Sequence, residues 1–446
     1  MRTLSPTPVR LLSAALSRCD LDAPPAPATR SAATGTRETS LHHVLSGEAL
    51  RAVFQPLVEL TSGDVVGYEA LVRGPADSEL ERPDALFGRA RADGRLGELD
   101  WACRAAAVRG ALDAGLPRGL RLFVNMEPEA LGVPCPDHLL ELWSHARDLD
   151  VVVEVTERAL TSRPADLLHA LEAFRALGWS IALDDVGADS RSLALLALLR
   201  PDVVKLDLRL VQARPDERVA EIVTAINAYA ERTGAVVLAE GIENEEHLAA
   251  AHAVGATHGQ GWFFGRPGPL PASLGCDART LPSVARRARV AGTTPFEVVG
   301  RVLPARRGAK PLLLAMSWLL ERQALGLGET AVLLSAFQTA ERFTPTTRAR
   351  YSHLADRVAF VAALGTGLEG EPAPGVRGAT LADDDALKDE WSVVVLAPHF
   401  AGALVAVDLG DTGPDDERRF DFALTYDRDL VMDAASSLMR RVQPLA

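Results

Sequence analysis

Short runs of β-branched and other apolar residues alternate with longer amphipathic stretches from residue 52 to about residue 264. The runs with the length of a strand read AVFQPLVEL, VVGYEALV, RLFVNM, VVVEVTE, IALDDVG, VVKLDL, VVLAEGIE and HGQGWFF. Between them lie helical patterns such as residues 166–177, where apolar side chains recur with a period near 3.6. This alternation predicts repeated βα units that close into a (β/α)8 barrel of the TIM type, an α/β fold.

Polar residues stand at the ends of these predicted strands. In a barrel, the ends of parallel strands meet at one face, and active sites are built there. Several of the polar residues interrupt apolar strands, where an ionised carboxylate costs several kcal/mol unless it is paired or bound to a metal. The set consists of Glu69, Asn125, Glu154, Glu157, Asp184, Asp185, Lys205, Asp207, Glu240, Glu243 and Gln260.

The chemistry of this set favours a particular kind of metal. It is rich in oxygen ligands, holds one lysine and includes no histidine, which suits Mg²⁺ or Mn²⁺ better than zinc. The adjacent Asp184 and Asp185 can diverge and serve two ions about 4 Å apart. Two such ions can activate a water and stabilise the leaving oxygen of a phosphodiester.

Some of these residues have a second interpretation. Glu157 and Asp207 could be structural carboxylates held in ion pairs, and for Asp207 we favour that interpretation. Lys205 could form a Schiff base, as in aldolases, but nearby carboxylates would raise its pKa and oppose that chemistry. Farther along the chain, Trp262 and Phe263 are predicted to pack. The histidines at 247, 252 and 258 are predicted to be solvated or on a helix surface, without a ligand role.

The motifs that carry these residues resemble the EAL-domain cyclic di-GMP phosphodiesterases. In chain order they are YEALVR, FVNMEPE, EVTE, ALDDVG, VVKLD, AEGIE and QGWFFGRP. The resemblance implies a cyclic-guanylate-specific phosphodiesterase with two Mg²⁺ or Mn²⁺ ions. Such an enzyme hydrolyses one phosphodiester bond of cyclic di-GMP, a bacterial second messenger, to give linear pGpG. It uses an activated water and forms no covalent intermediate.

The resemblance also implies roles for single residues. The first metal would be bound by Glu69, Asn125, Glu154 and Asp184, and the second by Asp184, Asp185 and Glu240. Glu69, Lys205 and Glu240 would be catalytic, with Lys205 orienting the attacking water or balancing charge near it. Arg73 would bind substrate phosphate, which suits guanidinium geometry, and Leu71 and Gln260 would also contact the substrate site. Glu157, Glu243 and Asp207 would help to position these ligands.

The loop after the aspartate pair departs from the family pattern. The family usually has DDFGTG, whereas this chain has DDVGADSRSL at residues 184–193. Gly74 also replaces a tryptophan that often follows the arginine. In the family that loop couples dimerisation to metal and substrate binding. A weak or inactive domain that acts as a cyclic di-GMP receptor or signalling scaffold is therefore the alternative function.

The length of the chain, 446 residues, exceeds what one hydrophobic core usually holds. We expect a disordered tail over residues 1–40, the barrel domain over 41–275, a linker over 276–284 and a smaller α/β domain over 285–446. In the last domain we predict a helix at 312–325, strands at 331–337 and 358–364, a hairpin at 392–409 and a helix at 428–442. The segments TPFEVVGRV and LLLAMSWLLERQ resemble the DICT domain, which implies a sensory or dimerisation role.

Charge and composition narrow the possible partners. The formal net charge of −13 opposes non-specific binding to nucleic acid or anionic membranes. No apolar run approaches the roughly 20 residues needed to span a bilayer, and residues 193–199 and 311–320 are predicted to be buried helix segments. The four cysteines include no CxxC pair, which fits a reducing cytoplasm. We expect a cytoplasmic homodimer with cyclic di-GMP as its ligand and without a direct nucleic-acid partner.

Overall fold

The computed structural model describes residues 41–444, except 46–48, 190, 213–215, 273, 275–280, 282–288 and 291. The predicted tail and most of the predicted linker lie outside the described residues. By its internal contacts the chain divides into two compact units that interleave along the sequence. One comprises Met1–Thr156, His169–Ala182 and Leu238–Pro282, and the other comprises Glu157–Leu168, Leu183–Val237 and Ser283–Ala446.

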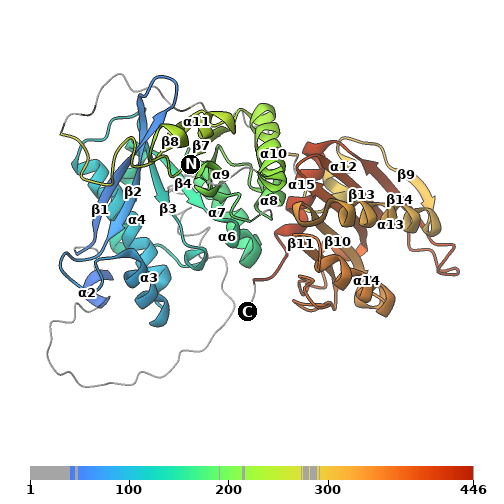
Figure 1. The fold of residues 1–446 in the computed structure, drawn as a ribbon. Coiled ribbons are helices and arrows are strands. Elements are labelled where there is room, and N and C mark those ends of the chain that lie inside the picture. The colour runs from blue at the N-terminus through green and yellow to red at the C-terminus, as the bar shows by residue number, and fades with distance from the viewer. Residues whose placement is uncertain are drawn as a thin grey trace, which may run out of the picture. The chain divides into compact units, whose positions relative to one another are not determined.

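Eight strands close into a barrel in sequence order, so the predicted barrel is confirmed (Figure 1). Each strand overlaps one of the predicted runs. The strands are β1 (Arg51–Glu59), β2 (Val65–Arg73), β3 (Arg121–Asn125), β4 (Asp150–Val155), β5 (Ser180–Val186), β6 (Val203–Leu206), β7 (Val236–Ala239) and β8 (His258–Gln260).

The first strand differs from the uniform βα pattern. β1 pairs antiparallel with both β2 and β8, whereas the pairs β2–β3, β3–β4 and β7–β8 are parallel. The cause is the connection between β1 and β2, residues 60–64, because a crossover to a parallel strand needs a dozen or more residues. The strand period in the sequence predicts that β1 is a strand but not the direction in which it runs.

Helices lie before β1 and between most of the later strands. They are α2 (Leu41–Leu45), α3 (Pro83–Ala92), α4 (Leu96–Asp113), α5 (Leu140–His145), α6 (Glu157–Ser162), α7 (Pro164–Ala176), α8 (Ser192–Leu199), α9 (Arg209–Gln212), α10 (Glu217–Thr233) and α11 (Glu245–Ala253). α10 shows how local sequence sets helix bounds. The Asp216 carboxylate accepts a hydrogen bond from the Val219 amide at 2.9 Å, and the helix ends at Gly234, whose φ of 75° is left-handed.

The C-terminal part of the chain forms a six-stranded sheet in the order β11-β10-β12-β13-β14-β9. Its strands are β9 (Arg306–Ala309), β10 (Val332–Thr339), β11 (Phe360–Thr366), β12 (Glu390–Ala397), β13 (Phe400–Asp408) and β14 (Arg419–Thr425). Its helices are α12 (Pro295–Gly300), α13 (Lys310–Leu327), α14 (Pro345–Ala355) and α15 (Arg428–Met439). The predicted helices, strands and hairpin of this part are present, and β9, β14, α12 and α14 are additional elements.

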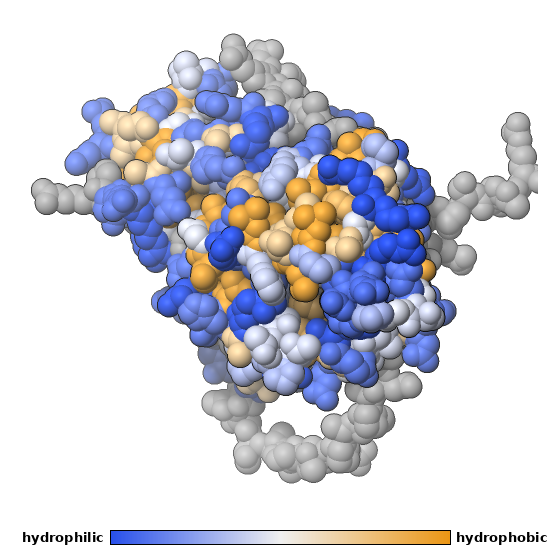
Figure 2. All heavy atoms as spheres, turned by 90° about the vertical axis from the view of Figure 1, so that its right-hand side faces the viewer, coloured by the Kyte–Doolittle hydropathy of each residue, from blue (hydrophilic) through white to orange (hydrophobic). Residues whose placement is uncertain are grey.

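The two long apolar runs differ in how completely they are buried. Residues 193–199 lie in α8 and are all buried, as predicted. The prediction is wrong for residues 311–320 of α13, because Leu312, Trp318 and Leu319 are 47%, 48% and 42% exposed, although Leu313 and Leu320 of the same helix are buried. Figure 2 shows apolar side chains gathered in the middle of one face of the molecule, with hydrophilic residues around them. Among the described residues, no helix has both the length and the hydropathy that a membrane span requires.

Candidate active site

Glu69 lies at the centre of a hydrogen-bonded group built from β1, β2, β3 and β8. Its Oε1 accepts a hydrogen bond from Asn125 Nδ2 at 3.0 Å, and its Oε2 accepts one from Gln260 Nε2 at 2.7 Å. Gln260 Nε2 also donates to Gln55 Oε1 at 3.1 Å. Strand register explains the meeting, because Gln55 is paired with Glu69 and Leu57 with Gln260. Three predicted site residues are thus brought together, with Gln55 as a fourth member.

Gln55 was missed from the sequence, although one signal pointed to it. It is a polar residue inside an apolar strand, and it is only 9% exposed. A buried amide of this kind must find hydrogen-bond partners. Its own Nε2 donates to the Gly265 carbonyl at 3.1 Å, so Gln55 fixes the amide orientation of Gln260.

The side-chain oxygen of Gln260 is an acceptor that is not used within the described part of the chain. Gln260 is 4% exposed, and its Oε1 is buried without a hydrogen bond. A buried acceptor of this kind costs free energy unless water or a cation meets it. This observation fits a site that holds a divalent ion and its water.

Glu154 lies in β4 beside Asn125 of β3, and the two are paired in the strand register. Glu154 is 1% exposed, while Asn125 is the exposed last residue of its strand. The Glu154 carbonyl accepts a hydrogen bond from the Met126 amide at 3.1 Å, which continues the pairing beyond β3. Asn125 therefore donates to the buried carboxylate of Glu69 and is the register partner of the buried Glu154.

The end of β5 presents Asp184 and Asp185. Asp184 Oδ1 lies 3.0 Å from Nζ of Lys205, which is 1% exposed in β6. Asp185 has a left-handed φ of 55°, so the chain turns sharply at the strand end. Desolvation raises the pKa of Asp185, and the carboxylates of Asp184 and Asp207 raise it further. A cation would relieve this repulsion, because an opposite charge favours the ionised form.

Asp184, Asp185 and Glu240 form an acidic group that could hold a metal ion. Each offers one carboxylate oxygen, and these atoms all lie within 4.8 Å of one another. Glu240 directly follows β7 and is half-buried. Carboxylate oxygens are the ligands that Mg²⁺ and Mn²⁺ prefer, so the donor set fits the predicted metals.

The residues assigned to supporting positions lie in different surroundings. Asp207 forms an ion pair with Arg209, with Oδ1 2.8 Å from Nε, and also accepts a hydrogen bond from the Arg209 amide at 2.8 Å. Glu243 is exposed, and its amide donates to His247 Nδ1 at 3.3 Å. Glu157 is the first residue of α6, and its side chain lies outside the described residues.

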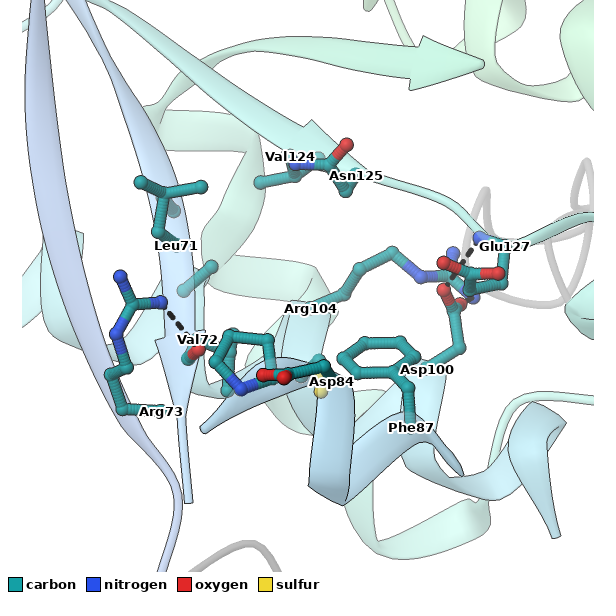
Figure 3. A pocket seen from close by; sticks show the side chains of 14 residues that line it. Leu71, Val72, Arg73, Asp84, Phe87, Asp100, Arg104, Val124, Asn125 and Glu127 are labelled. Atoms are coloured by element: carbon teal, nitrogen blue, oxygen red, sulfur yellow. Dashed lines mark hydrogen bonds and ion pairs between the residues drawn. The ribbon is translucent and has the colours of Figure 1, made fainter. Parts of the chain in front are cut away.

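A pocket of about 340 Å³ opens beside the end of β2 (Figure 3). Leu71, Arg73 and Asn125 line it, and Arg73 Nη1 donates to the Val72 carbonyl at 2.9 Å. Figure 3 shows Arg73 on one side of the pocket and the pair Asp100–Arg104 on the other. Two predicted substrate residues and one predicted metal ligand therefore share this cavity.

The pair Asp100–Arg104 was missed from the sequence. The two residues are one helical turn apart in α4, both side chains are 3% exposed, and Arg104 Nη2 lies 2.5 Å from Asp100 Oδ2. Burial raises the pKa of Asp100, and Arg104 opposes that change. Asp100 Oδ1 also accepts a hydrogen bond from the Glu127 amide at 2.8 Å. The spacing was visible in the segment DWACR, but surface helices carry the same spacing, so it does not reveal burial.

Three predictions near β8 are wrong. His258 is 6% exposed, and its burial lowers its pKa to about 4, because it lies on a strand between β1 and β7 rather than on a surface helix. Trp262 and Phe263 are 53% and 43% exposed instead of packed. The guanidinium of Arg266 lies 4.0 Å above the Trp262 ring, which it partly shields.

Comparison with known proteins identifies both parts of the chain. Residues 38–267 match the family model described as the EAL domain. The chain belongs to the EAL-domain family. Residues 301–409 match the DICT family model, described as a sensory domain in diguanylate cyclases and two-component systems.

The relatives of this EAL protein include named enzymes. It is 36% identical over 244 residues to the cyclic di-GMP phosphodiesterase NbdA of Pseudomonas aeruginosa, covering 53% of this chain and 31% of NbdA. It is 29% identical over 232 residues to the cyclic di-GMP phosphodiesterase RocR of the same species, covering 50% of this chain and 59% of RocR. The solved structure of Klebsiella pneumoniae BlrP1 in a manganese and cyclic di-GMP complex matches with 29% identity and a TM-score of 0.44. That match covers 50% of this chain and 57% of BlrP1.

Proposed function

We propose that the EAL barrel hydrolyses cyclic di-GMP to linear pGpG in a metal-dependent reaction. The observation that carries the proposal is the acidic group of Asp184, Asp185 and Glu240 at the strand ends. The family assignment and the relatives NbdA and RocR, which are named cyclic di-GMP phosphodiesterases, support the choice of substrate. The chain spans less than two thirds of either relative, so the proposal concerns the domain that they share.

The residues that would hold two Mg²⁺ or Mn²⁺ ions are those of the predicted sets. Glu69, Asn125, Glu154 and Asp184 would hold the first, and Asp184, Asp185 and Glu240 the second. Bound divalent ions supply Lewis acidity and lower the pKa of water. The buried Gln260 Oε1 supports the assignment, since it is an acceptor that a water or a cation could meet.

The protein's own groups orient the reactants. Lys205, held at 3.0 Å from Asp184, would donate a hydrogen bond to the attacking water and balance the charge of the aspartate pair. Gln260 holds the Glu69 carboxylate in one orientation through its Nε2. Arg73 would bind a substrate phosphate at the rim of the pocket, next to Leu71.

Three further residues are proposed to act indirectly. Asp207 raises the pKa of Asp185 and accepts a hydrogen bond from Arg209, and Glu243 lies three residues after Glu240 in the loop before α11. With Glu157 they would support the ligands, which is a common arrangement around metal sites.

The organisation of the whole chain is also a proposal. Residues 41–275 would be the phosphodiesterase domain and residues 276–284 a linker. Residues 285–446 would be a sensory or dimerisation domain that regulates the barrel. We propose that the protein acts in the cytoplasm as a homodimer.

Purified full-length protein, cyclic di-GMP and Mn²⁺ or Mg²⁺ test the function directly. We expect pGpG to form only with metal and to disappear in Glu69→Gln, because the neutral amide loses the charge but keeps the shape. Glu141→Gln, a change at an exposed position of α5, is the matched control and should keep full activity. Product is measured by chromatography.

The same assay distinguishes hydrolysis from the alternative function, a cyclic di-GMP receptor. Tight binding of cyclic di-GMP without product would identify the chain as a receptor, an outcome that the divergent loop at 184–193 favours. If the protein neither binds nor hydrolyses cyclic di-GMP, the substrate assignment is wrong.

A further inference from the structure

The helix α8 is apolar on all sides and covered on all sides. Its sequence is SLALLALL, and each of its eight residues is buried. A helix on the outside of a barrel normally keeps a polar outer face, whereas a helix that is apolar all round must be covered all round. The elements α6 and α10 of the barrel flank it. The 3₁₀ turn Gly328–Thr330, β12 and α15 of the C-terminal domain also pack against it.

The C-terminal end of α8 is fixed by an ion pair to the same domain. Arg200 caps the helix with a left-handed φ of 50°, a backbone conformation that residues other than glycine rarely adopt. Its Nη2 lies 2.8 Å from Asp433 Oδ1 of α15, and the Asp433 side chain is 5% exposed. The other carboxylate oxygen of Asp433 accepts a hydrogen bond from the Val290 amide at 2.9 Å.

A second contact holds the end of α6. The Arg377 guanidinium, on a residue only 9% exposed, donates to the carbonyls of Thr161 and Ser162, the last two residues of that helix. The last carbonyls of a helix have no partner inside it, and a cation is favoured there. Arg377 also donates to the Gln443 carbonyl, which ties this contact to the C-terminal end of the domain.

These two helices come next in the chain after strands that carry proposed metal ligands near their ends. α6 begins three residues after Glu154, and α8 follows the loop that starts at Asp184–Asp185. That loop is bonded to the first residue of α8. Ser192 Oγ donates to the Asp189 carbonyl at 2.7 Å and accepts from the Gly187 amide at 3.4 Å. A displacement of α8 would therefore move the loop.

We propose that the C-terminal domain is a positioning element of the barrel's metal site. It holds the two helices through the contact of Asp433 with Arg200 and the contact of Arg377 with the end of α6. Through these helices it holds the loop that follows Asp184 and Asp185. Arg200, Asp433 and Arg377 are positioning residues, since none of them belongs to the proposed ligand set. The inference rests on the proposed function for the identity of the site and adds the means by which the second domain controls it.

The test compares full-length wild-type protein with the variants Asp433→Asn and Arg377→Gln. Asp421→Asn is the matched control, because Asp421 forms an exposed ion pair with Arg307 inside the sheet of the same domain, with an N–O distance of 2.9 Å. Two quantities are measured without nucleotide. They are Mn²⁺ affinity by calorimetry, and hydrogen exchange of the peptide covering residues 186–199.

We expect Asp433→Asn and Arg377→Gln to weaken Mn²⁺ binding about tenfold, equivalent to ~1.4 kcal/mol. Exchange in residues 186–199 should become several-fold faster, while Asp421→Asn behaves as wild type. The charge swap Arg200→Asp with Asp433→Arg should recover most of the Mn²⁺ affinity, which a general loss of stability would not allow. Arg377→Lys retains the charge and should lie between wild type and Arg377→Gln.

Unchanged Mn²⁺ affinity and unchanged exchange in both variants would overturn the inference. If the wild type binds no Mn²⁺, hydrogen exchange of residues 186–199 is the deciding measurement. Wild-type exchange rates in both variants would then overturn the inference. Because neither readout uses cyclic di-GMP, a wild-type protein that binds Mn²⁺ but releases no pGpG refutes the proposed hydrolysis alone.

Discussion

Replacing Glu390 by glutamine should stabilise the C-terminal domain by an amount that grows with pH. Glu390 begins β12 and is 4% exposed, and its Oε2 accepts a hydrogen bond from the Phe296 amide at 3.0 Å. Burial raises the pKa of Glu390 from its ordinary value of 4.5 to about 7. Since the folded state binds this proton more tightly than the unfolded state, the stability it contributes is complete below pH 4.5. That stability is lost as the pH rises through about 7.

The two pKa values set the size of the effect. At 1.36 kcal/mol for each pH unit between them, the full loss is about 3 kcal/mol, of which roughly 1.4 kcal/mol falls between pH 6 and pH 8.5. Glutamine has nearly the same shape, keeps an acceptor oxygen and does not titrate. Any geometric cost of the substitution is therefore the same at both pH values and cancels in the comparison.

Urea unfolding at pH 6 and pH 8.5, followed by circular dichroism, measures this difference. The advantage of Glu390→Gln over wild type in unfolding free energy should be larger by roughly 1.4 kcal/mol at the higher pH. Glu417→Gln, at an exposed position of the same domain, should show no such growth. An advantage of equal size at both pH values would refute the reasoning, because it would mean that Glu390 does not titrate in this range.

Three further substitutions test other parts of the molecule. Arg104→Met should lower the unfolding free energy by about 3–5 kcal/mol, because it leaves the buried Asp100 without its cation. Thermal denaturation measures this, and the double variant with Asp100→Asn should recover part of the loss. Arg73→Lys should raise KM for cyclic di-GMP about tenfold, because it loses paired hydrogen bonds to phosphate; a fall in kcat at constant KM would contradict that role. Leu198→Ala, at a fully buried position of α8, should cost about 2–5 kcal/mol in urea unfolding, and a cost below 1 kcal/mol would show that α8 is not tightly packed.

Much of the fold and the site was readable from the sequence because both depend on local patterns. The period of two in the strands and of 3.6 in α7 follows from backbone geometry, so eight strands and their order could be predicted. Carboxylates inside apolar strands are costly and therefore informative, which is how Glu69, Glu154 and Asp184 were found. The roles of these residues came from a resemblance to a family and not from the pattern itself.

Other features depend on which segments meet in space. A polar residue in a predicted strand does not reveal which side chain it will contact. Gln55 is a neighbour of the site because β1 pairs antiparallel with both β2 and β8. The pair Asp100–Arg104 has the spacing of an ordinary surface pair, and only the packing of α4 shows that it is buried. The same holds for His258, whose low pKa follows from neighbours far away in the sequence.

The sequence by itself determined that the chain forms a barrel with oxygen-bearing side chains at its strand ends, because hydrophobic periodicity and the cost of buried charge act residue by residue. Only the tertiary structure decided what covers each apolar surface. The run in α8 and the run in α13 are both predominantly apolar, yet the first is wholly buried and the second exposes Leu312, Trp318 and Leu319. Hydrophobicity favours burial without choosing a partner, and the partner is chosen by which elements the rest of the chain brings alongside.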